Sequence, residues 1–241
     1  PADSRRMRSV RIELARVSLL LISKFNNDYR PLRHSLIQEL TLGQLVHNQH
    51  MSSPGNSTIY YLPGHGGHLS TGLGQGLMNR GFDVSGRETR GDFRKLPFDE
   101  QVQTIMDDLQ GHFWHEQSQV VCNSFGSYLF LQAQAQMPSF PGRVLLLSPI
   151  LGEFTNEKAR TSFSPPRPER LKTLAEAGQF NAPIHCEIHV GEEDWQSIPA
   201  NVESFGRLTG IPVTVVPNGG HDLGKAYVAP LLDRWLYDHA A

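Results

Sequence analysis

The chain has 241 residues, and its 22 Lys and Arg against 24 Asp and Glu give a formal net charge of −2 at neutral pH. This balance, with no basic stripe, gives no support to a nucleic-acid partner, and no apolar run is long enough to span a bilayer. The length fits one large α/β domain with a well-buried core.

Cysteine and histidine usage bears on compartment and metal binding. The two cysteines, Cys122 and Cys186, each lie in an apolar, strand-like run, which favours buried free thiols over a disulfide framework. The sequence therefore indicates a reducing, cytoplasmic location. The eleven His form no H-E-x-x-H motif and no cluster with the spacing of metal ligands, so we expect no bound metal.

The first 55 residues are an N-terminal segment of uncertain structure. Val10, Ile12 and Leu14 alternate as in a strand, whereas the leucines between positions 36 and 45 fit either a helix or a second strand. An alternative for the run 17–22 is the core of a signal peptide, although charged residues interrupt its approach. The polar stretch 52–57 resembles a junction, which makes Met51 an alternative natural start.

From residue 58 the sequence alternates between strand-like and helix-like stretches. The expected strands are 58–62, 82–85, 120–122, 144–147, 184–190 and 213–216. The expected helices begin near residue 70 and then cover 98–113, 127–137, 169–177, 199–208 and 227–237. This alternation predicts an α/β domain over residues 56–241, with a mostly parallel sheet of about six strands and helices on both faces.

One long connection interrupts the alternation. Residues 150–180 are rich in Pro and charge, and a connection of this length is often a lid over a site. Phe154, Phe163 and Phe180 could line an apolar substrate pocket between this segment and the loop 64–70. They could equally pack the segment onto the core.

The stretch C-N-S-F-G places Ser124 on the turn between an expected strand and an expected helix. A tight turn of this kind forces its central residue into strained backbone angles and requires small residues two positions away on each side. Cys122 and Gly126 meet this requirement, although the commoner G-x-S-x-G motif has glycine at both positions. Ser124 is therefore a candidate nucleophile, and the alternative is an ordinary helix N-cap.

Two further loops follow expected strands, G-E-E-D-W at 191–195 and P-N-G-G-H-D at 217–222. Because the carboxyl ends of parallel strands lie at one edge of a sheet, both loops are expected to meet Ser124 there. His221 could take the Ser124 proton and return it to a leaving group, and Asp194 could orient the imidazole.

Other carboxylates remain as alternatives for the acid. Glu192 or Glu193 could serve in place of Asp194, whereas Asp222 is less suitable because it adjoins His221 on the same loop. A solvent-facing turn residue is the alternative for His221 itself.

The loop 64–67 is rich in glycine, which lets the backbone approach a reacting group closely. An acyl-transfer transition state carries negative charge on the former carbonyl oxygen, and backbone N–H groups stabilise that charge. We expect the donors to be the N–H of Phe125 and the N–H of Gly67 or of its neighbour His68. The loop lacks the G-x-x-x-x-G-K pattern of a nucleotide-binding loop.

With L-P-G-H-G-G, C-N-S-F-G, G-E-E-D and G-G-H-D in this order, residues 57–241 resemble the α/β-hydrolase superfamily, in its serine hydrolase, esterase-like branch. The resemblance implies a triad of Ser124, His221 and Asp194, an oxyanion hole at Phe125 and Gly67, and neither a metal nor an organic cofactor. The sequence departs from the family pattern in two ways. Cys122 stands where glycine is commoner, and a clear pair of leading antiparallel strands is missing.

The resemblance implies hydrolysis of a small-molecule carboxylic ester or thioester through an acyl-enzyme intermediate on Ser124. An acyltransferase on the same fold is the first alternative. A catalytically inactive protein that keeps the fold for binding is the second.

Overall fold

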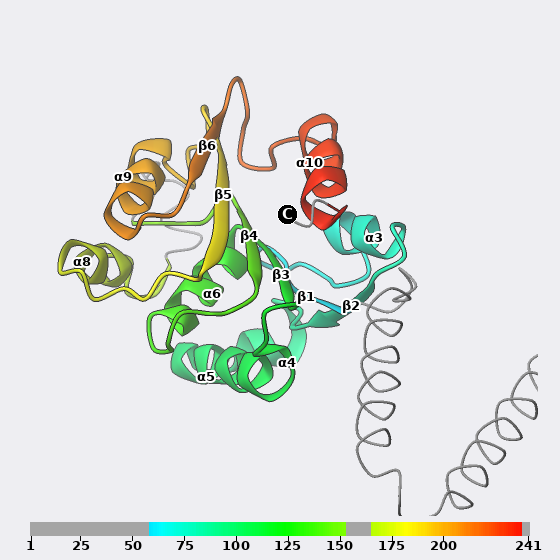
Figure 1. The fold of residues 1–241 in the computed structure, drawn as a ribbon, viewed down its shortest axis with the longest axis horizontal. Coiled ribbons are helices and arrows are strands. Elements are labelled where there is room, and N and C mark those ends of the chain that lie inside the picture. The colour runs from blue at the N-terminus through cyan, green and yellow to red at the C-terminus, as the bar shows by residue number, and fades with distance from the viewer. Residues whose placement is uncertain (1–57, 153–164, 238–241) are drawn as a thin grey trace, which may run out of the picture. The chain divides into compact units, whose positions relative to one another are not determined.

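The computed structural model describes residues 58–152 and 165–237, and its centre is a six-stranded parallel sheet (Figure 1). The strands are β1 Thr58–Leu62, β2 Asp83–Gly86, β3 Gln119–Asn123, β4 Arg143–Leu147, β5 His185–Gly191 and β6 Val213–Val216. They lie in the order β2-β1-β3-β4-β5-β6, and every neighbouring pair is parallel. The predicted strands and the parallel sheet are thus confirmed.

Helices cover both faces of the sheet, as predicted. They are α3 Gly72–Met78, α4 Gly91–Lys95, α5 Phe98–Asp108, α6 Phe125–Gln134, α8 Arg170–Glu176, α9 Pro199–Thr209 and α10 Lys225–Tyr237. In Figure 1, α5, α6, α8 and α9 lie on one side of the sheet, and α3 and α10 lie on the other. Because both faces are covered, the central strands β1, β3 and β4 are apolar along most of their length, and four of the five residues of β4 are buried.

The two faces have separate cores. The face under α5, α6 and α9 buries aromatic and aliphatic side chains such as Tyr128, Phe130 and Phe140, each 0% exposed. The face under α3 and α10 buries a smaller set, including Leu145 and Trp235. We call them the α6 face and the α10 face.

Some elements differ from the expectation. The predicted helix 98–113 is α-helical only to Asp108 and ends in a π-helical turn over Leu109–Phe113. The short helix α4 was not predicted, since it has no buried residue and hence no apolar periodicity. Among the described helices, none has the length and apolar character that a membrane crossing requires.

Three sequence-based expectations lie wholly or partly outside the described residues. The N-terminal segment, with the alternative start at Met51, is one of them. The boundary near residue 55 is another. Within the expected lid, residues 153–164, with Phe154 and Phe163, also lie outside, whereas the predicted helix 169–177 is present as α8.

Candidate active site

Ser124 occupies the turn between β3 and α6 in a strained backbone conformation, with φ 53° and ψ −121°. A side-chain-bearing residue rarely adopts a positive φ, and such strain persists only where the surroundings enforce it. The turn is enforced by close packing, because a Cβ on Gly126 would lie 2.1 Å from the carbonyl oxygen of Leu62. The Ser124 side chain makes no capping hydrogen bond to α6, which speaks against the N-cap alternative.

Cys122 fits the position that is more often glycine because its side chain lies in the core of the α6 face. It is 0% exposed, and it is paired in register with Leu62 of β1 and Leu146 of β4. Burial raises the pKa of the Cys122 thiol well above its ordinary value. This residue is therefore a packing group behind the turn.

The three residues predicted as a triad lie together. Ser124 Oγ is 2.7 Å from His221 Nε2, and His221 Nδ1 is 2.8 Å from Asp194 Oδ2 and 3.0 Å from Oδ1. Because the ionised carboxylate can only accept hydrogen bonds, it favours the tautomer in which Nδ1 carries the proton. Nε2 is then left to accept the hydrogen bond from the Ser124 hydroxyl.

The Asp194 carboxylate is held beside His221 by backbone N–H groups of its own loop. The N–H groups of Gln196 and Ser197 donate to Oδ1 at 2.9 and 2.8 Å, and the carboxylate side chain is 0% exposed. These two donors were not predicted, because they depend on the turn after Asp194 and not on residue type. They stabilise a buried charge that would otherwise be costly.

The alternative carboxylates do not reach His221. Glu192 and Glu193 are exposed, and Glu192 Oε2 accepts from the N–H of Asn218 at 3.0 Å. Asp222 is exposed as well and accepts from the N–H of Gly224 at 3.2 Å. Among the candidate acids, Asp194 is the one that the structure brings to the imidazole.

Gly67 does not have the geometry that was predicted for an oxyanion donor. Its N–H donates to the Gly64 carbonyl at 2.9 Å and lies 3.1 Å from Thr89 Oγ1. Thr89, which is 1% exposed, also donates its hydroxyl to the Gly64 carbonyl, and its backbone carbonyl accepts from the Gly66 N–H at 3.0 Å. This arrangement does not support the expected role of Gly67, because its backbone N–H already contacts Gly64 and Thr89.

The part of the loop that lies against the turn is Gly64. A Cβ at this position would lie 3.2 Å from Ser124 Cβ and 3.6 Å from Ser124 Oγ. The side chain of the next residue, His65, packs edge-on against the ring of Phe125 with centroids 5.9 Å apart. Burial, followed by the charge of Arg94, lowers the pKa of His65.

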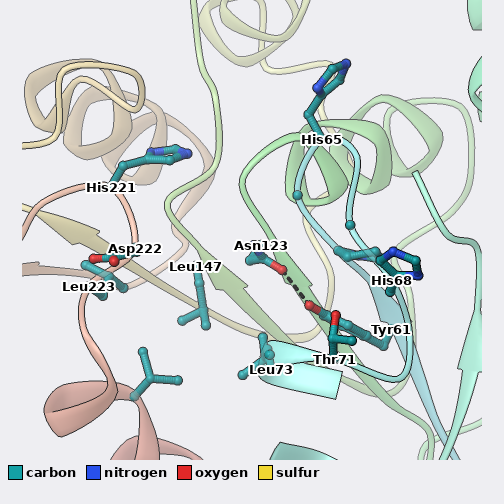
Figure 2. Close-up of a pocket in the computed structure, with 15 residues that line it drawn as sticks. Tyr61, His65, His68, Thr71, Leu73, Asn123, Leu147, His221, Asp222 and Leu223 are labelled. Atoms are coloured by element: carbon teal, nitrogen blue, oxygen red, sulfur yellow. Dashed lines mark hydrogen bonds between the residues drawn. The ribbon is translucent and has the colours of Figure 1, made fainter. Parts of the chain in front are cut away.

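A cavity of about 350 Å³ lies between the loop 63–73 and the segment 221–228 (Figure 2), and His221 and Asn123, the residue before Ser124, are among the residues that line it. Its walls include the apolar side chains of Leu73, Leu147, Leu223 and Val228. Asn123, the residue before Ser124, lines it together with Tyr61, whose hydroxyl donates to Asn123 Oδ1 at 2.9 Å. A cavity of this size lies within the usual range of small-ligand sites.

This cavity only partly matches the expected position of the substrate. The loop 64–70 forms one wall as predicted, but the other wall is the segment 221–228 and not the segment 150–180. Phe180 is 9% exposed and packs against Phe205 at 5.1 Å between ring centroids, so it belongs to the core. No sequence pattern indicated the wall at 221–228, which depends on how α10 meets the sheet.

Within residues 58–152 and 165–237, no group of three His, Cys, Asp or Glu side chains could hold a metal ion. The His side chains nearest the cavity serve other contacts. His68 Nδ1 lies 3.0 Å from Arg90 Nη1 and 3.5 Å from Glu88 Oε1, and His221 is bonded to Ser124 and Asp194.

No protein-family model and no curated protein matches the sequence. Solved structures match the fold. One is the ydeN gene product from B. subtilis (TM-score 0.54, 12% identity, 75% of this chain and 98% of that chain covered). Another is from a study of carboxylesterases of the thaumarchaeon Nitrososphaera gargenis (0.53, 13%, 75% and 89%). A third is MGS-MChE2, an alpha/beta hydrolase from a lagoon-sediment metagenome (0.53, 18%, 75% and 90%). At these identities the likeness is one of fold.

Proposed function

The chain has the α/β-hydrolase fold, and from this premise we propose that it is a serine hydrolase that cleaves a carboxylic ester or thioester. The observation that carries the proposal is the chain of contacts from Ser124 Oγ through the His221 imidazole to the buried Asp194 carboxylate. Fold alone does not fix function. The proposal is instead supported by these three groups, which lie together at the carboxyl edge of the sheet.

The first half of the reaction forms an acyl-enzyme. His221 Nε2 takes the hydroxyl proton of Ser124 as Oγ attacks the carbonyl carbon of the substrate. The resulting tetrahedral intermediate collapses when the bond to the leaving alkoxide or thiolate breaks, and His221 returns the proton to that leaving group. Asp194 keeps the imidazole oriented and stabilises its charged form.

The second half repeats these steps with water. His221 takes a proton from a water molecule, the resulting hydroxide attacks the acyl carbon, and the acid product leaves as the proton returns to Ser124 Oγ. Water is the second substrate of a hydrolase. If an alcohol or amine took its place, the same groups would make the protein an acyltransferase.

The negative charge of the tetrahedral intermediate needs backbone donors. We assign the first to the N–H of Phe125, at the start of α6, where the helix dipole adds favourable potential. The second is assigned to the loop 64–67, because Gly64 of this loop lies against Ser124. Gly67 and Thr89 then have a supporting role, since they fix the loop by internal hydrogen bonds.

Labelling with a fluorophosphonate probe tests the proposal, because such a probe reacts covalently with an activated serine. We expect labelling of the wild-type protein, its loss in Ser124→Ala, and its retention in Ser85→Ala, a matched change at an exposed position of β2. Absence of labelling in the wild type, or labelling that survives Ser124→Ala, would refute the hydrolase and favour an inactive binding protein. Product analysis with added alcohols separates the hydrolase from an acyltransferase.

A further inference from the structure

Two polar residues of the cavity wall, Asn123 and Tyr61, have no part in the proposed chemistry, yet they are hydrogen-bonded to each other. Asn123 precedes Ser124 in the strained turn, and its amide lies beside Tyr61 at the bottom of the cavity (Figure 2). We propose that this Asn123–Tyr61 pair selects substrates that carry a neutral hydrogen-bond acceptor, an ether, carbonyl or hydroxyl oxygen, a few bonds from the scissile carbonyl. The inference deepens the proposed hydrolase function and rests on it.

Tyr61 fixes the direction of the Asn123 amide. The Tyr61 side chain is 3% exposed, and burial raises the pKa of its phenol far above the ordinary value, so the hydroxyl keeps its proton and donates to Asn123 Oδ1 at 2.9 Å. With Oδ1 held in this way, Nδ2 faces the loop, 3.1 Å from where a Cβ on Gly64 would be. The amide hydrogens are therefore presented beside Ser124.

The hydrogens of Asn123 Nδ2 are available to a substrate acceptor. No residue that the structure describes accepts a hydrogen bond from Asn123 Nδ2. A donor that loses water to an apolar group stays unsatisfied and costs roughly 1 to 3 kcal/mol. A substrate oxygen at this point would instead replace the water, so the cavity discriminates between an oxygen and a methylene of similar size.

The surrounding charges favour a neutral group over an anion. Asp222 lines the cavity with an exposed carboxylate, which repels a second negative charge. The guanidinium of Arg90, which lies 3.0 Å from Nδ1 of the lining residue His68, is itself not among the residues that line the cavity. An anionic acyl group would therefore find no committed cationic partner among the described side chains that line the cavity.

The size of the cavity limits the group further. A volume of about 350 Å³ lies near the small end of the range of ligand sites, which suits a short group. The apolar part of the wall is formed by Leu73, Leu147 and Val228. The substrate group that fits is a short chain, apolar along its length, with one oxygen that reaches Asn123.

Isosteric ester pairs test the inference, because an ether oxygen and a methylene differ little in size. On the acyl side, kcat/KM is measured for p-nitrophenyl methoxyacetate against butanoate and for 3-methoxypropanoate against pentanoate. On the alcohol side, 2-methoxyethyl acetate is compared with butyl acetate. The two arms show which part of the substrate enters the cavity.

The readout is the ether-to-methylene ratio of kcat/KM, compared between variants so that intrinsic ester reactivity cancels. In one arm we expect the ratio to fall roughly three- to tenfold in Asn123→Leu, which corresponds to one neutral hydrogen bond. Tyr61→Phe, which only releases the amide, should lower the same ratio by less. Asn181→Leu, a matched change at an exposed residue whose amide donates to the Met137 carbonyl, should leave it unchanged.

If the ether-to-methylene ratio of kcat/KM is the same in the wild type and in Asn123→Leu, on both the acyl and the alcohol side, the inference is wrong. The proposed function still stands in that case, because the wild type hydrolyses the esters. If Asn123→Leu does not fold, an unchanged ratio in Tyr61→Phe overturns it in the same way. If the wild type hydrolyses none of these esters and Ser124 takes no fluorophosphonate, the proposed function is refuted and this inference with it.

Discussion

The two faces of the sheet differ in how completely they are filled. Every residue of α6 is buried, and the α6 face packs aromatic rings against one another, as in the edge-on contact of Phe130 with Phe140. The α10 face has the smaller core. The cavity lies on this face, between the loop 63–73 and the segment 221–228. One sheet thus supports a rigid side, which fixes Ser124, and a less filled side, which leaves space for a substrate.

The contact of Ser124 with His221 joins these two sides, because Ser124 heads α6 and His221 precedes α10. Breaking it should have the largest effect of all. We expect Ser124→Ala and His221→Ala each to lower kcat for p-nitrophenyl acetate by about 10⁴-fold or more, since triad members act as a unit. Ser85→Ala and His185→Ala, at exposed positions, are the controls. A variant that keeps a tenth of the activity would remove its residue from the mechanism.

Asp194→Asn should come next, with kcat lower by about 10³- to 10⁴-fold, because an amide at this position favours the wrong imidazole tautomer. Stopped-flow or steady-state kinetics with p-nitrophenyl acetate measure this loss of kcat. Glu193→Gln, a matched neutralisation on the same loop, should leave kcat within a factor of about two because its side chain is exposed. The opposite pattern would show that Glu193 is the acid.

A matched pair of leucines sharpens the comparison between the faces. Leu129 of α6 is 0% exposed, so Leu129→Ala should lower the free energy of unfolding by about 2 to 5 kcal/mol. Leu73 lines the cavity, and Leu73→Ala should cost about 1 kcal/mol and raise the relative kcat/KM for longer acyl chains. Urea denaturation and a chain-length series measure both effects. Equal losses of stability would mean that the two faces are equally filled.

The smallest expected effect on stability concerns Glu187 of β5, which contacts Arg234 of α10. The His189 imidazole, with Nε2 3.6 Å away, and the Arg234 guanidinium of α10, 3.1 Å away, hold the pKa of Glu187 below its ordinary value of 4.5. A lowered pKa means that the ionised carboxylate stabilises the folded state above that ordinary value. This contribution is lost as the pH falls through the folded-state pKa.

Glu187→Gln should therefore lower the free energy of unfolding at pH 7 by on the order of 1 kcal/mol or less, since the pair is partly exposed. The difference from the wild type should shrink as the pH falls below about 4. Urea titrations at pH 7 and pH 3.5 compare the two proteins. A difference that grows toward acid pH would reverse the assigned sign.

The sequence predicted the features that depend on topology. Apolar runs bounded by turn residues located the strands, and parallel strands bring their carboxyl ends to one edge, so Ser124, Asp194 and His221 could be placed together although 97 positions separate Ser124 from His221. Small residues around Ser124 pointed to the strained turn for a steric reason that the close approach of Gly126 to Leu62 bears out.

Features that depend on individual hydrogen bonds or on side-chain packing were missed. The glycines of the loop 64–67 show that the backbone approaches something closely, but not that the Gly67 N–H turns toward Thr89, 22 positions away. The wall at 221–228 depends on how α10 packs against the sheet, and no periodicity encodes this. The pairing of Tyr61 with Asn123 likewise joins two strands at a register that only the structure gives.

The raised pKa of both native thiols has a practical use. Cys122 and Cys186 are the two cysteines of the chain, the first buried and the second partly buried, and burial raises the pKa of each, which disfavours the thiolate at neutral pH. A Ser124→Cys variant would therefore carry a single alkylatable sulfur, beside the His221 imidazole. The rate at which iodoacetamide consumes it would report on the imidazole as a base, against a silent background and without any knowledge of the natural substrate.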